Sequence, residues 1–252
     1  MRRAIVDRVL IGLCLALLVF DGILVLDRVL SKGTPPAFEA VRARYGLTET
    51  VSVANRGSVL EKIKTSANKT NWVELREISP ILVKTIVAAE DIRFWRHSGI
   101  DLLALLHAGV LGAVGKSDRD GNTVTMQLAD TLEESAEKGR VSKNFRKKWE
   151  QICSARAIER RWTKEEILEA YLNLTVFHGY LRGVGAASAR VFHKSCSRLD
   201  ENESLLLAAL IRSPFSSAET VAQKAVRLKH RMKLTGDDDI INRLADETLN
   251  RM

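Results

Sequence analysis

The stretch 79-SPILVKTIVAAEDIRFWRHSG-99 decides the expected fold, because it joins an apolar helix directly to a cluster of charged and aromatic side chains. Ser79 followed by Pro80 is a typical helix start, with a capping hydroxyl and a proline at the first helical position. Aliphatic residues then continue to Ala89. The pattern predicts a helix that ends where the charged side chains begin.

Glu90 comes four residues after Ile86, so both side chains share one face of this helix. We therefore expect the Glu90 carboxylate to be partly desolvated. Burial raises the pKa of a carboxyl group, which suits it to accept a proton near neutrality. The plain alternative is a helix-end glutamate paired with Arg93 or Arg96.

Helical patterns dominate the rest of the chain. A capping box at Thr163 and Glu166 marks one helix start, and Gly179, Gly183 and Gly185 mark a bend. Strand-like alternation of useful length occurs only in residues 50–60, so the fold class is mainly α. The remaining helices are expected at 102–114, 123–132, 144–162, 163–174, 184–193, 200–212, 217–233 and 239–251.

An apolar segment at residues 9–26 is long enough to cross a bilayer, although Asp21 interrupts it. Arginines precede the segment, and no small-residue cleavage site follows it. The pattern favours an uncleaved transmembrane anchor with a cytoplasmic amino terminus. We divide the chain into a tail and anchor (1–32), a linker with a short lead-in segment (33–70) and one folded domain (71–252).

The composition is basic, with 39 Lys and Arg against 31 Asp and Glu, a formal charge of +8. Nearly all of this surplus lies in residues 140–164, where nine basic residues accompany only Glu150 and Glu159. Arg146 and Glu150 are one helical turn apart, an arrangement in which cations could hold phosphate beside a carboxylate. The alternative is a solvated basic helix with a surface ion pair.

Other chemistries find little support in the sequence. It contains no C-x-x-C, H-E-x-x-H, P-loop or G-x-G-x-x-G pattern, and its five histidines are scattered. Without these motifs, no nucleotide or organic cofactor is expected. The basic helix also lacks the aromatic platforms of RNA-binding surfaces, so no nucleic-acid partner is expected. Cys153 and Cys196 are expected to be buried free thiols.

Five motifs, in this order, resemble those of the family-51 peptidoglycan glycosyltransferases, the enzymes that polymerise lipid II. The resemblance covers about residues 72–233. An E-D-x-x-F-x-x-H-x-G motif is complete, and a motif spanning residues 163–173, TKEEILEAYLN, matches almost letter for letter. The other matches are a G-x-T-V-T-x-Q-L segment at 121–128, an R-K-x-x-E segment at 146–150, and a leucine- and alanine-rich helix at 203–214.

The resemblance implies a lysozyme-like, two-lobed helical domain in the plasma membrane, with its catalytic domain outside the cytoplasm. Its partners would be lipid II, the growing glycan strand, the membrane and cell-wall synthesis proteins. Glu90 would be the general base, and Glu150 would assist at the donor site, directly or through Mg²⁺ or Mn²⁺. The implied substrate-binding residues are Asp91, Phe94, His97, Thr123, Gln127, Arg146, Lys147 and Asn173.

The chain departs from the family pattern near the phosphate site. Asp130 and Trp149 replace lysines, Asn122 and Met126 replace a serine and a glutamine, and His178 and His193 replace glycines. The main hypothesis is an active lipid II polymerase. The alternatives are a weakened relative that binds lipid II or a cell-wall partner without polymerising it, and a lysozyme-like hydrolase of finished glycan.

Overall fold

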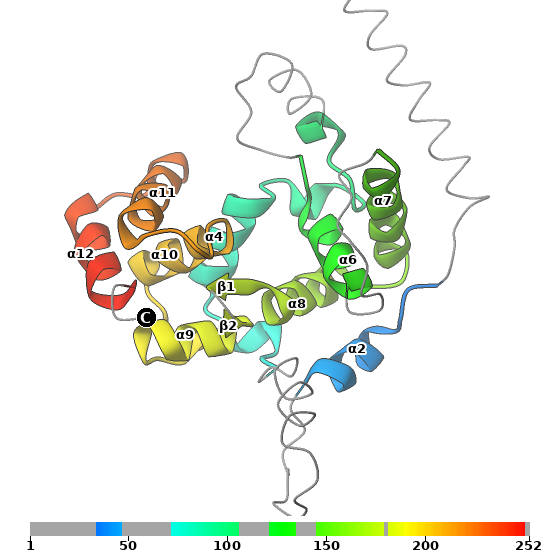
Figure 1. The fold of residues 1–252 in the computed structure, drawn as a ribbon, viewed down its shortest axis with the longest axis horizontal. Helices are drawn as coiled ribbons and strands as arrows, with labels where there is room; N and C mark the ends of the chain where they lie inside the picture. Colours follow the sequence, from blue (N-terminus) through cyan, green and yellow to red (C-terminus); the bar gives the residue numbers. More distant parts are fainter. Residues whose placement is uncertain (1–33, 47–71, 106–120, 135–144, 179–180, 250–252) are drawn as a thin grey trace, which may run out of the picture. The chain divides into compact units, whose positions relative to one another are not determined.

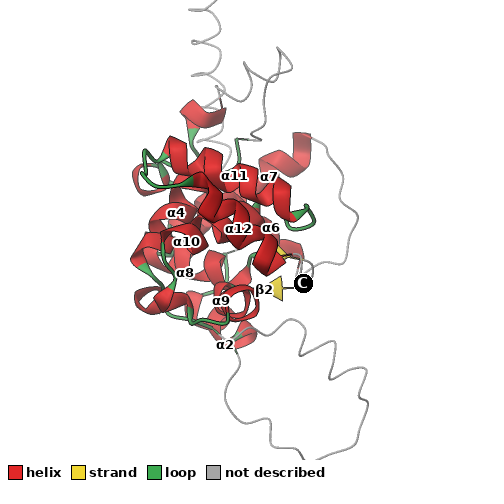
Figure 2. Ribbon diagram, turned by 90° about the vertical axis from the view of Figure 1, so that its left-hand side faces the viewer, coloured by secondary structure: helices red, strands yellow, loops and turns green. Residues whose placement is uncertain are grey.

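The computed structural model describes residues 34–46, 72–105, 121–134, 145–178 and 181–249. Residues from Pro36 onwards form one compact unit. Within the described part the structure is mainly helical (Figures 1 and 2), as the sequence predicted. The helices are α2 (Phe38–Tyr45), α4 (Pro80–Glu90), α6 (Val124–Glu134), α7 (Phe145–Glu159), α8 (Lys164–Leu174), α9 (Val184–Phe192), α10 (Glu201–Ile211), α11 (Ala218–Arg231) and α12 (Asp238–Leu249), with short 3-10 turns η1 (Leu75–Glu77), η2 (Phe94–Arg96) and η3 (Cys196–Arg198).

Helix α10 forms the centre of the main core. Eight of its residues, from Glu203 to Leu210, are buried, and it packs against α4, α11 and α12. A capping box between Asp200 and Glu203 begins the helix. Because α10 is apolar on all sides, it gives α4 a rigid apolar surface to pack on.

Helix α4 buries Leu82, Thr85, Ile86, Val87 and Ala89 and leaves the opposite side open. Pro80 occupies the first helical position, as predicted. The Ser79 hydroxyl, however, donates to the carbonyl of Leu199 rather than capping the helix. Fixed at both its start and its apolar face, α4 places Glu90 at a defined point.

A second, smaller apolar cluster lies between α6 and α7. It contains Ile100, Met126, Ile152 and Ala155. Hydrogen bonds link the same helices, because Gln151 donates to the Met126 carbonyl at 3.3 Å and to the Asp130 carboxylate at 2.6 Å. Helix α6 also packs on α8, so it connects the basic helix to the rest of the unit.

Two local elements were not predicted. Helix α2 lies in the segment expected to be a linker, and it packs on α8. Phe38 anchors it in edge-to-face contacts with Trp72 and Trp162. A two-stranded antiparallel ribbon, β1 (Val176–His178) with β2 (Leu181–Arg182), occupies the predicted bend.

The helix start at Thr163 has the predicted capping box.

Several predictions fall wholly or partly outside the described residues. They are the apolar span at 9–26, the strand-like stretch at 50–60 and most of the helix at 102–114, of which residues 102–105 are helical. No helix in the described ranges is both long and apolar enough to cross a bilayer. Cys153 and Cys196 are free thiols, as expected, although Cys153 is only partly buried.

Asn173 joins α8 to the segment before α4. Its side chain is fully buried, and it pairs with both the amide and the carbonyl of Val73 at 2.8 Å while donating to the Glu169 carbonyl. Glu169 accepts from Trp72 and from the Leu75 amide. These bonds fix the start of the domain against α8.

We expect Asn173→Ala to lower the free energy of unfolding by about 1–3 kcal/mol, because it leaves backbone groups of Val73 without partners. The matched control is Asn242→Ala at an exposed position of α12, which should change stability by less than about 0.5 kcal/mol. Denaturant unfolding of both variants measures the difference. Equal effects would show that the Asn173 bonds add nothing to stability.

Candidate active site

Glu90 is the last residue of α4, and its side chain is only 6% exposed. Its Oε2 accepts a hydrogen bond of 3.0 Å from Gln127 Nε2 of α6. Its Oε1 is buried, accepts no hydrogen bond within the described part, and lies 4.0 Å from Arg212 Nε. The predicted alternative is not found, since Arg93 binds Asp101 instead. One oxygen of Glu90 is thus held by protein and the other is uncommitted.

Burial raises the pKa of Glu90 above its ordinary value. The guanidinium of Arg212, the hydrogen bond from Gln127 and the more distant Arg231 act in the opposite direction. A carboxyl group under these opposing influences is suited to accept a proton near neutral pH. This environment is the one that the sequence predicted for Glu90.

Two arginines meet the carboxyl end of α4. Arg212 donates to the Ala89 carbonyl at 3.2 Å, and Arg231 donates to the Ala88 carbonyl at 2.6 Å. They satisfy carbonyls that a helix end leaves without partners, and their charge complements the helix dipole. Sequence reasoning missed both residues, because they lie more than 120 positions from the end of α4, Arg212 directly after α10 and Arg231 at the end of α11.

Asp91 and His97 are buried beside Glu90 and contact each other. His97 Nε2 lies 2.9 and 3.0 Å from the two carboxylate oxygens of Asp91. Asp91 Oδ2 also accepts from the Val124 amide at 3.1 Å, which caps the start of α6. In this structure both residues have protein partners. Contact of either with substrate stays a prediction.

Thr123 and Gly99 complete the junction between the first two motifs. The Thr123 hydroxyl donates to the Gly99 carbonyl at 2.6 Å and accepts from the Met126 amide. Gly99 has φ +88°, and a Cβ there would lie 3.0 Å from the Ala155 carbonyl oxygen of α7. Only glycine allows this close approach without strain.

Phe94 is fully buried and forms part of the floor below this junction. The ammonium of Lys164 lies 4.3 Å from the centre of its ring. Lys164 also pairs with Glu159, which accepts from the Thr125 hydroxyl. Phe94 therefore supports the site from within the core.

The basic helix α7 carries the second predicted carboxylate. Glu150 is exposed on α7, and Lys148 binds the Asn122 side chain. Arg146 and Lys147 lie in the first turn of α7, but their side chains fall outside the described part. Helix α6 contacts the helices that carry both predicted acids, because Gln127 binds Glu90 of α4 and Asp130 binds Gln151 of α7.

Asn173 does not join the Glu90 cluster. Its buried amide is occupied by Val73 and Glu169, so its place in this structure is at the start of the domain. Gln127 does join the cluster, and so does Tyr171, which sequence reasoning did not single out. Tyr171 donates to Gln127 Oε1 at 3.3 Å.

The residues in the described ranges do not form a metal site. No group of three or more His, Cys, Asp or Glu side chains among them could hold an ion. Asp91 pairs with His97 and the Val124 amide, and one oxygen of Glu90 accepts from Gln127. Assistance by Mg²⁺ or Mn²⁺ at the donor site stays a prediction.

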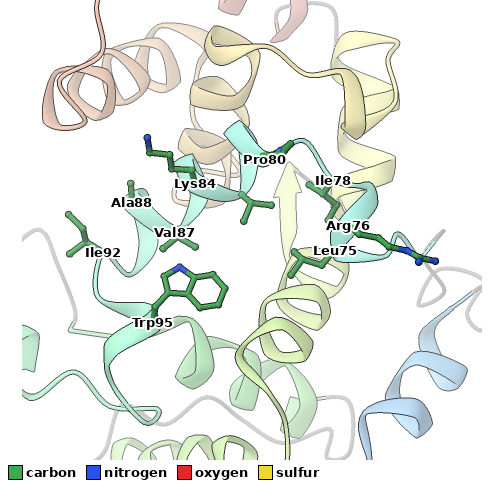
Figure 3. A pocket seen from close by; sticks show the side chains of 10 residues that line it. Leu75, Arg76, Ile78, Pro80, Lys84, Val87, Ala88, Ile92 and Trp95 are labelled. Atoms are coloured by element: carbon green, nitrogen blue, oxygen red, sulfur yellow. The ribbon is translucent and has the colours of Figure 1, made fainter.

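A hollow of about 540 Å³ lies along the open side of α4. Leu75, Val87 and Trp95 face it from different sides, while Lys84 and Arg76 point outward at its rim (Figure 3). None of the predicted site residues lines it. The hollow is therefore a neighbour of the Glu90 cluster and not part of it.

A buried carboxylate with one oxygen that accepts no hydrogen bond in the described part, next to a cation and at a helix end, has the chemistry to accept a proton. A family model described as Transglycosylase matches residues 56–237. The chain belongs to this transglycosylase family, in agreement with the resemblance of its motifs.

Individual relatives agree with the family match. A biosynthetic peptidoglycan transglycosylase of Thiobacillus denitrificans is 35% identical over 144 residues, which cover 57% of this chain and 60% of the relative. One from Shewanella oneidensis is 33% identical over 171 residues, covering 66% and 71%. Penicillin-binding protein 1A of Escherichia coli is 34% identical over 164 residues, covering 62% and 19%. The chain thus spans less than two thirds of the Thiobacillus relative.

We expect Glu90→Gln to stabilise the protein at neutral pH but not in acid. Below the ordinary pKa of 4.5 the carboxyl group is protonated in both states and adds no penalty. As pH rises through the higher folded-state pKa, the folded protein must ionise a buried group, and stability is lost. Each unit of pKa difference corresponds to about 1.4 kcal/mol.

Thermal unfolding at pH 4 and pH 7.5 measures this effect. The control is Glu165→Gln, an equal change at an exposed position of α8. We compare the stability change caused by Glu90→Gln with that caused by Glu165→Gln at each pH. If Glu90→Gln is no more stabilising at pH 7.5 than at pH 4 after this comparison, Glu90 is not a buried carboxylate with a raised pKa.

Proposed function

We propose that this protein is a membrane-anchored peptidoglycan glycosyltransferase that polymerises lipid II into glycan strands and releases undecaprenyl pyrophosphate. The single observation that supports this most is the state of Glu90, which is buried at a helix end with Oε1 free beside Arg212. The family match and the names of the relatives supply the substrate class. The proposal includes the lysozyme-like, two-lobed arrangement of the domain.

In the proposed reaction, Glu90 takes the proton from the 4-hydroxyl of the acceptor GlcNAc. The hydroxyl oxygen then forms a bond with the anomeric carbon of the donor MurNAc, and the bond from that carbon to the diphosphate oxygen breaks. Attack from the face opposite the leaving group inverts the anomeric configuration. A base positioned for such a proton is worth about 10²–10⁴ in rate.

The departing diphosphate carries negative charge that cations must neutralise. We assign this part to Arg146 and Lys147 at the start of α7, with Glu150 assisting at the donor. The charge surplus of residues 140–164 supports the assignment. Glu90 and α7 are linked through α6, so the base and the phosphate site would belong to one connected framework.

The proposal places the chain in the plasma membrane through residues 9–26, with the domain outside the cytoplasm. The apolar segment and its arginine-rich flank support this topology. Growing glycan, the membrane and other cell-wall synthesis proteins would be its partners.

A second candidate is a relative that binds lipid II without polymerising it. Asp130 and Trp149 in place of two lysines favour it, since they remove positive charge near the phosphate site. In the structure Asp130 accepts a hydrogen bond from Gln151, so the replaced side chain has a new partner on α7.

We expect purified full-length protein to convert labelled lipid II into polymer, and Glu90→Gln to lower the rate by about 10²–10⁴ because the base is lost. Gel separation of the products measures both, with Glu165→Gln as the control that should retain activity. Polymer formed by Glu90→Gln at the wild-type rate would contradict the assigned base. Binding without polymer, unchanged when lysine replaces Asp130 and Trp149, would establish the second candidate.

A further inference from the structure

Three helices contribute one side chain each to a chain of hydrogen bonds that ends at Glu90. Tyr171 of α8 lies 3.3 Å from Gln127 Oε1, and Gln127 Nε2 of α6 lies 3.0 Å from Glu90 Oε2. Tyr171 is 2% exposed, so its hydroxyl is shielded from solvent. The other oxygen of Glu90, Oε1, has no hydrogen-bond partner within the described ranges.

The Tyr171 hydroxyl has two side-chain partners, Gln127 and Thr175, and the contact with Gln127 bears on which way the amide points. Burial, and then the nearby charge of Glu90, raise the pKa of Tyr171 well above its ordinary value, so the hydroxyl keeps its proton. A protonated phenol donates best to an oxygen, which places Oε1 of Gln127 towards Tyr171. The amide nitrogen must then face Glu90.

We propose that Gln127 and Tyr171 are positioning residues for Glu90: the tyrosine fixes the amide, the amide holds Oε2, and Oε1 is left as the atom that accepts the proton. This inference rests on the proposed function for its reaction. It assigns Gln127 to the base and not to direct contact with substrate, as the sequence resemblance implied.

The direction of these hydrogen bonds also affects the charge of the base. An N–H donor favours the carboxylate form of Glu90, whereas an amide turned the other way would favour the protonated form. The charged groups that act on Glu90 from neighbouring elements are Arg212, directly after α10, and Arg231 of α11, with Asp91 next in the chain. Tyr171→Phe leaves all three of these side chains unchanged.

Tyr171→Phe removes the donor and keeps the ring. We expect the pKa of Glu90 to rise in this variant, because the freed amide donates less to Oε2. Carbon-13 NMR of full-length protein labelled at the glutamate carboxyl carbons measures it, and Glu90→Gln identifies the signal. The matched control is Tyr45→Phe, a buried tyrosine of α2 that should leave the titration unchanged.

Kinetics on lipid II supply a second test. We expect Tyr171→Phe to lower kcat about 3- to 10-fold at neutral pH, to leave KM unchanged, and to move the acid limb of the rate profile to higher pH. Gln127→Met, which lacks both amide groups, should do the same to a greater extent. In the Gln127→Met background, Tyr171→Phe should then have no further effect.

The results separate the inference from the proposed function. An unchanged Glu90 titration in Tyr171→Phe, or independent effects of the two substitutions, would overturn the positioning role even if the protein polymerises lipid II. A higher KM with unchanged kcat in Gln127→Met would assign Gln127 to substrate binding. If wild type forms no polymer, the proposed function fails, while the NMR titration still decides how Glu90 is held.

Discussion

The buried carboxylate of Asp91 is the interaction on which the site depends. It ends α4, binds His97 through both oxygens and caps the amide of Val124 at the start of α6. An anion at a helix start is favoured both by the free amide and by the helix dipole. Because Asp91 joins the end of one helix to the start of another, it sets Glu90 opposite Gln127. A shift of this junction would move Glu90 away from Gln127.

The carboxyl end of α4 is also where opposing electrostatic effects meet. Burial against α10 raises the pKa of Glu90, and Arg212 lowers it. The same arginine satisfies the Ala89 carbonyl, so one side chain both completes the helix end and moderates the charge of the base. The site therefore uses core packing to make Glu90 basic and two surface arginines to keep it ionisable.

Local patterns in the sequence predicted the helices and the setting of Glu90 well. The proline at the start of α4, the capping box at Thr163 and the spacing of Glu90 from Ile86 act within one or two helical turns. The sequence did not predict helix α2, because its anchor Phe38 depends on Trp72 and Trp162, which are distant in the chain. The sequence did not identify Arg212 for the same reason, since its contact with α4 joins residues distant in the chain. The buried position of Asn173 could not be predicted either, because it depends on Val73 lying beside α8.

The departures from the family pattern follow the geometry of α6. Met126 and Asp130 are one turn apart on one side of α6, with Gln127 on the neighbouring side, while Asn122 and Thr123 lie just before the helix. The substituted residues of this segment meet α7: Asn122 binds Lys148, Met126 packs in the cluster with Ile152, and Asp130 binds Gln151.

Gln127 meets Glu90, whereas Thr123 meets Gly99, which itself packs on α7. Substitution on the α7 side therefore changes how the basic helix is held and leaves the partners of the base in place. Glu90 contacts α6 through Gln127, and α7 contacts it through Asp130. The residues that hold α7 can therefore be substituted without changing the residue that holds Glu90.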